Sequence, residues 1–337
     1  MTHIVSGKME LNFNKTREYF DFLSHLPKHD SEETWPFMGD PTVYKNFNNL
    51  SSLSNFRKRE VLNTYKPSSV EMISEVHDLV TVIPFRYRYL HLEKSIESLL
   101  KSYESVKFSL AIVVVENSQT SIASDICSRF KNVYYRWLDS GGKLFNKCIC
   151  HNIGEGITKS KFLHFHDCDL LVSCDFYKEL YETLLITEIV QAFSKRRVNY
   201  IDESNTRRLI DGDSLESVIK NSGNFRPGMF GAPGGSVAIS RSLFKRVGGF
   251  DSQLFWEYAP EDAFFWAKVE KFQNIVGLNN PPVELYHLWH LSQYGKNPHK
   301  VFDKSVLDIF MNNPDFHDFI ETSKNIYKEI NEYIINK

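Results

Sequence analysis

The stretch FLHFHDCDLLV, from Phe162 to Val172, anchors the predicted fold. An apolar run ends in Asp167-Cys168-Asp169, and the sequence then becomes apolar again. If the run is a buried strand, both carboxylates can face one hard cation, because the side chain between them points elsewhere. Two solvated loop aspartates are the plainer interpretation of an isolated pair, so the surrounding sequence has to decide between them.

The surrounding sequence alternates between apolar β-rich runs and helical patterns. Strands are predicted at 79–85, 108–115, 133–137 and 161–166, with helices at 90–103, 122–130 and 145–155. Continuous apolar strands that alternate with amphipathic helices predict an α/β fold, in which a mainly parallel mixed sheet is covered on both faces. Ligands of such sheets bind at the carboxyl ends of the strands.

Composition excludes several classes of partner. The 337 residues include 40 Lys and Arg against 42 Asp and Glu, so a net charge of −2 predicts no general attraction to nucleic acid. Five cysteines without C-x-x-C spacing argue against a disulfide framework and a structural zinc site. The sequence also lacks a bilayer-spanning apolar run and a signal-peptide core. We therefore expect a cytoplasmic protein without a transmembrane segment, which is compatible with peripheral membrane contact.

Two further strand ends carry polar groups that a core does not need. Pro84-Phe85-Arg86-Tyr87-Arg88 places two guanidinium groups past the first strand, where they can hold a diphosphate or stack on a base. Glu116 and Asn117 end the second strand and suit a ribose or base edge. Surface arginines and an ordinary turn would explain each alone. Together with the aspartate pair, they predict a nucleotide site.

The glycine-rich pieces do not indicate a different nucleotide site. Gly141-Gly142-Lys143 is followed by Leu144, so it lacks the Ser or Thr of a P-loop. No G-x-G-x-x-G follows the first strand. Walker-type ATPases and Rossmann dehydrogenases are therefore excluded.

The second half of the chain adds aromatic, acidic and imidazole groups. Trp256 and Tyr258 precede Glu261 and Asp262, a combination that suits sugar recognition and hydroxyl deprotonation. The preference of helix N-termini for acids would explain the carboxylates alone. The apolar stretch 283–291 contains further candidate metal ligands, although core histidines are the plainer interpretation: Glu284, His287 and His290.

Taken in order, these stretches resemble the GT-A glycosyltransferases, and most closely the β-1,4-galactosyltransferase-like family with its galactosyltransferase C-terminal region. The resemblance covers about 79–298. It is carried by the Pro-Phe-Arg-x-Arg sequence at 84–88, Phe145-Asn146-Lys147 with Asn152, Asp167-Cys168-Asp169, Gly234-Gly235-Ser236-Val237-Ala238 through Gly248-Gly249-Phe250, and Trp256 through Asp262.

The resemblance implies a metal-dependent, inverting transferase of bacterial type. It would move a hexose or N-acetylhexosamine from a UDP-sugar to a hydroxyl of a glycan or glycolipid, in surface polysaccharide or glycolipid biosynthesis. Mn²⁺ or Mg²⁺ would be held by Asp169 and His287, with His290 competing for the histidine position and with help from Asp167 or Glu284. Asp262 would be the base beside Glu261. The donor-binding positions would be Pro84, Arg86, Arg88, Glu116, Asn146, Asp167, Gly235, Trp256 and Tyr258.

The sequence departs from the family pattern at two places. Ala259-Pro260 replaces the Gly-Gly that precedes Glu-Asp, so the substrate loop is expected to be stiffer. Ala232 aligns with a bulky tyrosine of galactose-specific members, which suggests room for a 2-acetamido group.

Two other functions use some of the same residues. His164, His166, Asp167 and Asp169 form the pattern of a metal-dependent hydrolase, in which a bound water attacks a phosphoester or amide. A carbohydrate-binding module without catalysis would use the aromatic residues. The hydrolase leaves Arg86 and Arg88 without a role, and the binding module does not need the aspartate pair.

The predicted organisation has three parts. Residues 1–75 form an N-terminal extension, and 76–300 form the GT-A domain, with a nucleotide-binding half at 76–175 and an acceptor or catalytic half at 226–300. Residues 301–337 form a C-terminal helical segment, with Phe319, Ile326 and Ile330 among its core candidates.

Overall fold

The structure of the protein is a computed structural model. It describes residues 4–5, 8–9, 16–25, 50–66, 72–104, 106–141, 145–193, 198–221, 226–227, 235–255, 261–278, 283–291 and 316–335.

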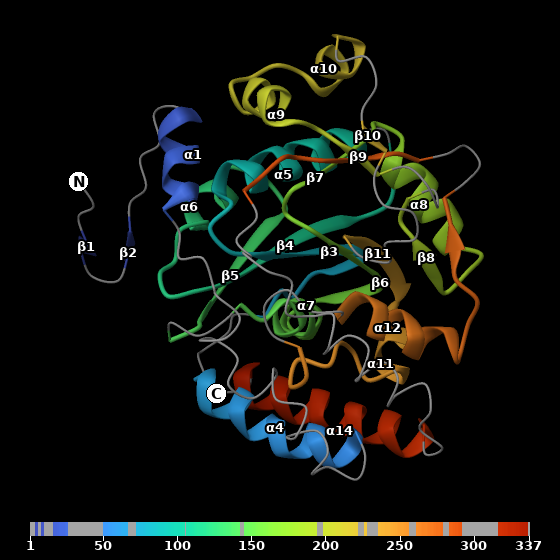
Figure 1. Ribbon diagram of the computed structural model, residues 1–337. Coiled ribbons are helices and arrows are strands. Elements are labelled where there is room, and N and C mark those ends of the chain that lie inside the picture. The colour runs from blue at the N-terminus through green and yellow to red at the C-terminus, as the bar shows by residue number, and fades with distance from the viewer. Residues whose placement is uncertain are drawn as a thin grey trace.

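A seven-stranded mixed sheet forms the centre of the molecule (Figure 1). Its order is β12 (Val276–Gly277), β8 (Ile189–Gln191), β11 (Ser236–Ser240), β6 (Lys159–His166), β3 (Val76–Phe85), β4 (Leu110–Ser118) and β5 (Val133–Asp139). Strands β6, β3, β4 and β5 are parallel, and β11 is antiparallel to β6 and β8. The predicted mainly parallel mixed sheet is confirmed.

A smaller sheet lies at the carboxyl edge of the main one. Its order is β10 (Arg226–Pro227), β9 (Val198–Tyr200), β13 (Leu285–His287) and β7 (Leu170–Val172). Because His287 of β13 pairs with Leu170 of β7, the histidine lies beside the end of the Asp167-Cys168-Asp169 segment. A two-stranded sheet of β1 (Ile4–Val5) and β2 (Lys8–Met9) is separate. The short strands β8 and β9 fall in a region where the sequence predicted irregular structure.

Helices cover both faces of the main sheet, as expected for strands that are apolar throughout. Helices α5 (Tyr89–Tyr103), α6 (Ser124–Cys127) and α8 (Phe176–Leu184) share a core with Leu79 and Ile83 of β3. Helices α7 (Lys147–Gly156), α11 (Arg241–Arg246) and α12 (Glu261–Glu270) share the opposite core with Val80 and Val82. Alternate residues of β3 therefore serve the two cores.

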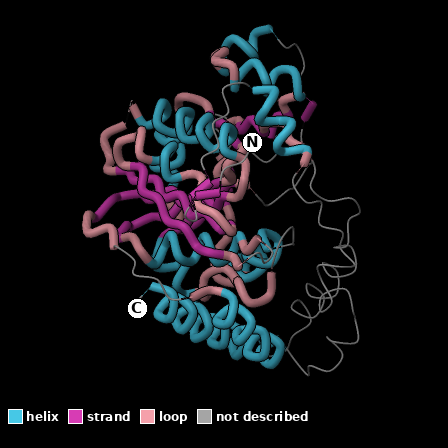
Figure 2. The backbone as a smooth tube through the Cα atoms, turned by 90° about the vertical axis from the view of Figure 1, so that its left-hand side faces the viewer, coloured by secondary structure: helices cyan, strands magenta, loops and turns pink. Residues whose placement is uncertain are grey.

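The remaining helices extend these layers. Helix α1 (Thr16–Ser24) lies near α5, and α9 (Glu203–Ile210) and α10 (Leu215–Asn221) lie beyond α5 (Figure 1). Helices α4 (Leu50–Thr64) and α14 (Phe316–Ile335) run side by side outside α7, as Figure 2 also shows. Lys58 of α4 and Glu329 of α14 are paired at 2.6 Å. None of the helices in the described part of the chain is long and apolar enough to cross a membrane.

Helices α4 and α14 share the hydrophobic core that packs against the main sheet. Leu53 and Val61 of α4 belong to the same hydrophobic cluster as Val80 and Val82, and so do the buried side chains of α14, which include Phe319, Ile326 and Ile330. The divisions proposed at 75 and 300 therefore separate segments of sequence that share one packed core.

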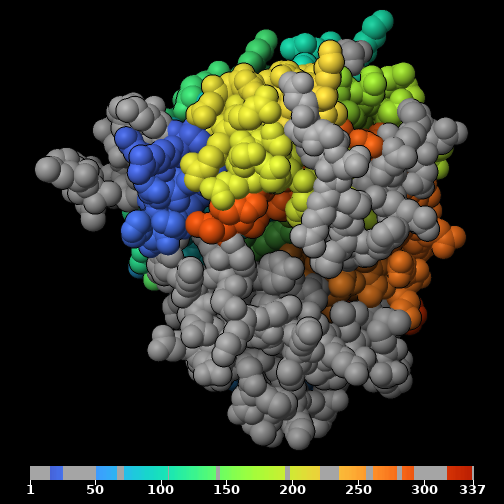
Figure 3. Space-filling view, turned by 45° about the horizontal axis from the view of Figure 1, so that its top comes forward, coloured from blue at the N-terminus to red at the C-terminus, as the bar shows by residue number. Residues whose placement is uncertain are grey.

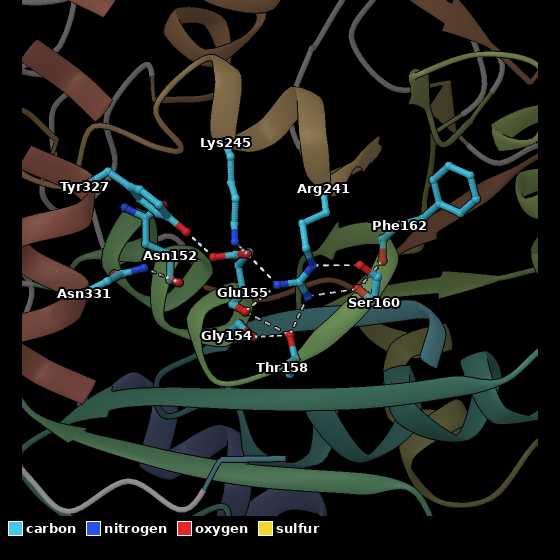
Figure 4. A network of polar contacts seen from close by, with 10 residues as sticks. All are labelled: Asn152, Gly154, Glu155, Thr158, Ser160, Phe162, Arg241, Lys245, Tyr327 and Asn331. Carbon is cyan, nitrogen blue, oxygen red and sulfur yellow. Dashed lines mark hydrogen bonds and ion pairs between the residues drawn. The ribbon is translucent and has the colours of Figure 1, made fainter. Parts of the chain in front are cut away.

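A buried polar network ties α14 and α11 to the end of α7 (Figure 4). The Glu155 carboxylate accepts hydrogen bonds from Tyr327 and Arg241, and Lys245 lies 3.5 Å away. Arg241 also donates to the carbonyl oxygens of Glu155 and Ser160 and to the hydroxyls of Thr158 and Ser160. These bonds use all three guanidinium nitrogens, so the network is satisfied internally.

Candidate active site

The turn after β3 brings an arginine to the carboxyl edge of the sheet. Pro84 is buried within β3, opposite Val115. Tyr87 has a φ of 63°, a left-handed conformation that is rare for a bulky residue and typical of functional sites. The Arg88 guanidinium forms an ion pair with the Asp169 carboxylate. The Arg86 guanidinium lies 5.0 Å from the centre of the Tyr87 ring.

Asp169, His287 and His290 form a group that can hold a metal ion. One possible ligand atom from each of the three residues lies within 4.8 Å of the others. The Nε2 atoms of His287 and His290 lie 3.8 Å and 3.4 Å from the Asp169 carboxylate oxygens. Both histidines are partly exposed and Asp169 is buried, so the group opens to solvent on the imidazole side.

The protonation states of this group suit a cation. His290 Nδ1 lies 3.1 Å from the Leu291 carbonyl, which can only accept, so Nδ1 carries the proton and Nε2 keeps its lone pair. Burial, and then the charge of Arg88, lower the pKa of His290 to about 3, so the ring is neutral at neutral pH. Burial would raise the pKa of Asp169, but the electrostatic effects of the nearby His287 and of the Arg88 guanidinium outweigh it and keep that pKa far below its ordinary value.

Two predicted ligands lie apart from this group. Glu284 accepts a hydrogen bond from the Tyr286 hydroxyl at 2.8 Å and one from Asn199 at 3.3 Å. Glu284 directly precedes β13 and lies three residues before His287, so by strand alternation the two side chains point to opposite sides. Asp167 also lies outside the group that can hold a metal ion, although it was expected to share a cation with Asp169. Strand β6 ends at His166, so alternation no longer aligns Asp167 with Asp169, and Asp167 turns toward Lys147.

Lys147 joins three carboxylates at the start of α7. Its Nζ lies 3.0 Å from Asp167, 3.2 Å from Glu261 and 3.4 Å from Asp262. Burial disfavours the lysine cation, but the three acids hold its pKa well above the ordinary value. In the sequence, Lys147 stands within the Phe145-Asn146-Lys147 motif, and nothing in the motif indicates a role for it. The signal that could have found it is a lysine at the first position of a helix that begins at the carboxyl edge of the sheet.

The carboxylates around Lys147 differ from one another. Burial, with a further contribution from Asp262, raises the pKa of Glu261 to about 8. Burial raises the pKa of Asp167 to about 6 despite the opposing charge of Lys147. Glu261 is 7% exposed and Asp262 is 26% exposed, so Asp262 is the more accessible acid. The structure therefore brings Glu261 and Asp262 together, with Asp262 facing outward.

Gly235 lies against this site. Its φ of +93° is a conformation that favours glycine, and its carbonyl accepts the Asp167 N–H at 2.8 Å. A Cβ at this position would lie 3.0 Å from the Leu170 side chain and 3.7 Å from an Asp167 carboxylate oxygen. A side chain here would be strained and would crowd the aspartate.

Two predicted donor-binding residues are instead engaged within the fold. Glu116 is fully buried, and its carboxylate accepts bonds from the Tyr135 and Ser118 hydroxyls and from the N–H groups of Ile122 and Ala123. Asn146 is also fully buried, caps α7 by accepting the Ile149 N–H, and donates to the Ser252 carbonyl. Both residues fix the elements around the site, and a ligand would have to displace these bonds to reach them.

The histidines of the hydrolase hypothesis are core residues. His164 and His166 are fully buried on one face of β6, and their rings lie 5.0 Å apart. Each ring nitrogen has a partner: the Thr81 and Ser236 hydroxyls for His164, and the Ser236 hydroxyl and the Leu170 carbonyl for His166. Burial lowers the pKa of His166 to about 4. The predicted cluster of two histidines and two aspartates around one metal does not form.

Trp256, Tyr258, Ala232 and the Ala259-Pro260 pair, which was expected to stiffen the substrate loop, lie outside the described residues. Their predicted roles in stacking and donor selection remain predictions.

The family profile described as "Glycosyltransferase like family 2" matches residues 81–328, from within β3 to within α14. The chain belongs to this family. Residues 81–328 therefore form a glycosyltransferase domain, and the mixed sheet with helices on both faces is the GT-A fold. Family membership confirms the predicted transferase class. A comparison with curated proteins gave no match.

Several solved structures are similar to this glycosyltransferase. The catalytic domain of Drosophila beta1,4-galactosyltransferase 7, in complex with xylobiose, is 16% identical with a TM-score of 0.40, over 60% of this chain and 66% of that one. TarS from S. aureus is 13% identical with a TM-score of 0.48, over 76% and 73%. GalNAc-T7 with UDP, GalNAc and Mn²⁺ is 13% identical with a TM-score of 0.49, over 77% and 55%. The chain thus spans just under two thirds of the galactosyltransferase structure and about half of the GalNAc-T7 structure.

Proposed function

We propose that this protein is a metal-dependent, inverting glycosyltransferase that moves a hexose or N-acetylhexosamine from a UDP-sugar to a hydroxyl of an acceptor glycan. On the resemblance described above, we extend the proposal to glycan or glycolipid acceptors of surface polysaccharide or glycolipid biosynthesis. One observation carries it. The possible metal site formed by Asp169, His287 and His290 lies at the same edge of the sheet as the two acids that begin α12. Asp167 and Lys147 connect the two groups.

Asp169, His287 and His290 fit a divalent cation. One carboxylate and two imidazoles are suitable ligands for Mn²⁺, and the two nitrogen ligands favour it over Mg²⁺, which prefers oxygen. Both rings have a nitrogen available: within the described ranges His287 Nδ1 has no hydrogen-bond partner, and His290 Nε2 faces Asp169. A cation bound here would neutralise the charge that develops on the diphosphate leaving group.

Arg88 and Arg86 would bind the diphosphate. Arg88 now neutralises Asp169 through an ion pair, and a cation at Asp169 would compete with that guanidinium. The guanidinium would then be available for the phosphate oxygens, which match its planar donor geometry. Arg86 lies two residues away in the same turn.

Asp262 would act as the base. It would accept the proton of the acceptor hydroxyl while that oxygen forms a bond to the anomeric carbon. The bond from that carbon to the UDP oxygen breaks on the opposite face, so the configuration inverts. Glu261, whose pKa is raised to about 8 by burial, keeps its proton at neutral pH, whereas Asp262 is the more exposed of the two acids. Two neighbouring acids in different environments thereby take different roles.

A panel of UDP-sugars tests the proposal. The purified protein is incubated with UDP-glucose, UDP-galactose and their N-acetylated counterparts, with Mn²⁺ or with EDTA, and the release of UDP is measured. We expect release from at least one donor, at least about tenfold faster with Mn²⁺, and an Asp169→Asn variant that loses the response to Mn²⁺. Release that is unchanged in EDTA would contradict metal dependence, and the absence of release from every donor would contradict the donor class.

A further inference from the structure

The N-terminal helix α1 lies beside the possible metal site of Asp169, His287 and His290, although it is far from these residues in the sequence. Resting on the proposed function, we infer that α1 is part of the active site: Tyr19 and His91 are positioning residues that fix the peptide group preceding His290 and so set the affinity for the metal ion. The supporting observations come from the docking of α1, a chain of hydrogen bonds, and the fixed loop at 287–290.

Helix α1 is seated on elements that surround the site. Tyr19, Phe20 and Leu23 are buried and form one cluster with Leu90, Ile210 and Trp289. The Phe20 ring lies 5.7 Å from the Trp289 ring, and the guanidinium of Arg207, on α9, lies 4.1 Å from the Phe20 ring. In Figure 3 the blue surface of α1 borders the yellow surface of α9 and α10 and the orange-red surface of 283–291. The helix therefore has a defined seat next to the loop that bears both histidines.

A hydrogen-bond chain connects α1 to that loop. Tyr19 Oη lies 2.6 Å from His91 Nδ1, and His91 Nε2 lies 2.9 Å from the Trp289 carbonyl oxygen. Because a carbonyl only accepts, Nε2 carries the proton and Nδ1 accepts from the Tyr19 hydroxyl. Burial lowers the pKa of His91 to about 4, so the ring is neutral and the direction of the chain is constant at neutral pH.

The chain ends on the peptide group that precedes His290. The Trp289 N–H donates to the Thr206 hydroxyl at 2.9 Å, and the Leu288 N–H donates to the Asp169 carbonyl at 2.9 Å. His91 thus supplies the bond to the carbonyl of Trp289, whose carbon is bonded to the backbone nitrogen of His290. Groups that orient metal ligands change metal affinity by about 10- to 100-fold when they are removed.

Packing alone does not account for Tyr19 and His91. The rings of Phe20 and Trp289 and the side chain of Leu23 already bury apolar surface between α1 and the loop. A hydroxyl and an imidazole that are both fully buried carry a desolvation cost, which is offset only by well-formed hydrogen bonds. The bonds that they make fix one orientation of the loop.

Mn²⁺ affinity tests the inference with a readout other than turnover. Binding of Mn²⁺ in the presence of UDP is measured by electron paramagnetic resonance for the wild type, Tyr19→Phe, His91→Phe and His91→Gln. Tyr103→Phe is the matched control, because Tyr103 is also on α5 and its hydroxyl donates to a backbone carbonyl, that of Phe108. Melting temperatures show whether each variant is folded.

We expect the Kd for Mn²⁺ to rise by at least about tenfold in His91→Phe and by a few-fold in Tyr19→Phe. In His91→Gln it should stay closer to the wild type, because the amide can still donate to the Trp289 carbonyl. Tyr103→Phe should bind Mn²⁺ as the wild type does. The KM for Mn²⁺ should follow the Kd, while kcat at saturating Mn²⁺ changes little.

Two results would overturn the inference in distinguishable ways. If the wild type binds Mn²⁺ and folded Tyr19→Phe and His91→Phe bind it with the same Kd as Tyr103→Phe, α1 is only a packing element and the proposed function is unaffected. If the wild type binds no Mn²⁺ with UDP present, the proposed function fails and the inference fails with it. Tyr19→Phe removes a single oxygen atom, so the test remains decisive even if His91→Phe does not fold.

Discussion

The two ends of helix α7 carry opposite kinds of charge cluster. At its C-terminal end, Glu155 is one buried carboxylate that meets Arg241 and Lys245 and accepts from Tyr327. At its N-terminal end, Lys147 is one buried cation that meets Asp167, Glu261 and Asp262. The helix connects β5 to β6, so one end lies at the carboxyl edge of the sheet and the other at the amino edge.

The difference indicates which cluster is structural and which is functional. At the Glu155 end, all three guanidinium nitrogens of Arg241 donate hydrogen bonds to protein oxygens. Such a network is suited to holding α14 in place. The Lys147 end has more acid than base, and burial, with a smaller contribution from the neighbouring acids, raises the pKa values of Asp167 and Glu261. Unbalanced buried charge of this kind is costly for stability and is typical of active sites.

The largest effect is expected at the functional end. Asp262→Asn should lower kcat by about 100- to 10,000-fold, because the amide cannot take the acceptor proton, while UDP binding persists. Transfer kinetics and calorimetry with UDP measure the two quantities. Asp175→Asn, at an exposed aspartate that begins α8, should leave both unchanged. Full turnover by Asp262→Asn would remove Asp262 from the base role.

The next effect separates the two ends directly. Arg241→Met should lower the free energy of unfolding by about 3–5 kcal/mol, because it leaves Glu155 buried without its main partner. Its kcat per folded molecule should stay near the wild type. Lys147→Met should lower kcat by at least about tenfold, since Asp262 loses its neighbouring cation. Urea unfolding and transfer assays compare the two, and equal losses of kcat would show that both ends serve catalysis.

A smaller effect depends on pH. The pKa of Glu261 is raised from 4.5 to about 8, so between those values the native state binds a proton that the unfolded state has released. Stability from this group is therefore present at low pH and is lost as pH rises toward 8. Relative to Glu261→Gln, the wild type should lose up to about 1.4 kcal/mol per pH unit in urea unfolding at pH 5, 6.5 and 8. Glu97→Gln, at an exposed glutamate, should show the wild-type slope.

The smallest effects rank the partners of Glu155. Tyr327→Phe should lower the free energy of unfolding by about 1–2 kcal/mol, because it removes a hydrogen bond to a buried carboxylate. Lys245→Ala should lower it by less than about 0.5 kcal/mol, because the lysine is 57% exposed. Thermal or urea unfolding resolves this difference. The reverse order would mean that the exposed lysine, not the tyrosine, braces the carboxylate.

Local sequence pattern predicted the features that depend on short-range regularity. The apolar runs and helical spacings located β3, β4, β5 and β6, because a buried strand or an amphipathic helix must repeat its pattern. They missed β8 and β9, which have only three residues each and too few repeats to show a period. The role of α1 was also unpredicted, since a docking surface far along the chain leaves no local signal.

Side-chain partners were harder to predict than strand ends. Glu116 lies at a strand end as predicted, but the N–H groups at the start of α6 satisfy its carboxylate inside the fold. Nothing in the sequence indicated that Lys147 differs from an ordinary helical lysine, although three acids from two other segments contact it. In both cases the deciding contacts span many residues of sequence, so no spacing rule reports them.

The sequence by itself determined that Arg88, Glu116 and the Asp167-Cys168-Asp169 segment end buried strands, because the polarity of a strand and the period of its side chains are local properties. Only the tertiary structure decided that Asp169 meets His287 and His290, that Asp167 meets Lys147, and that α1 reaches the same loop through Tyr19. The physical reason is that partner choice depends on which surfaces the packed core brings together, and close packing selects one arrangement among many that the same local pattern allows.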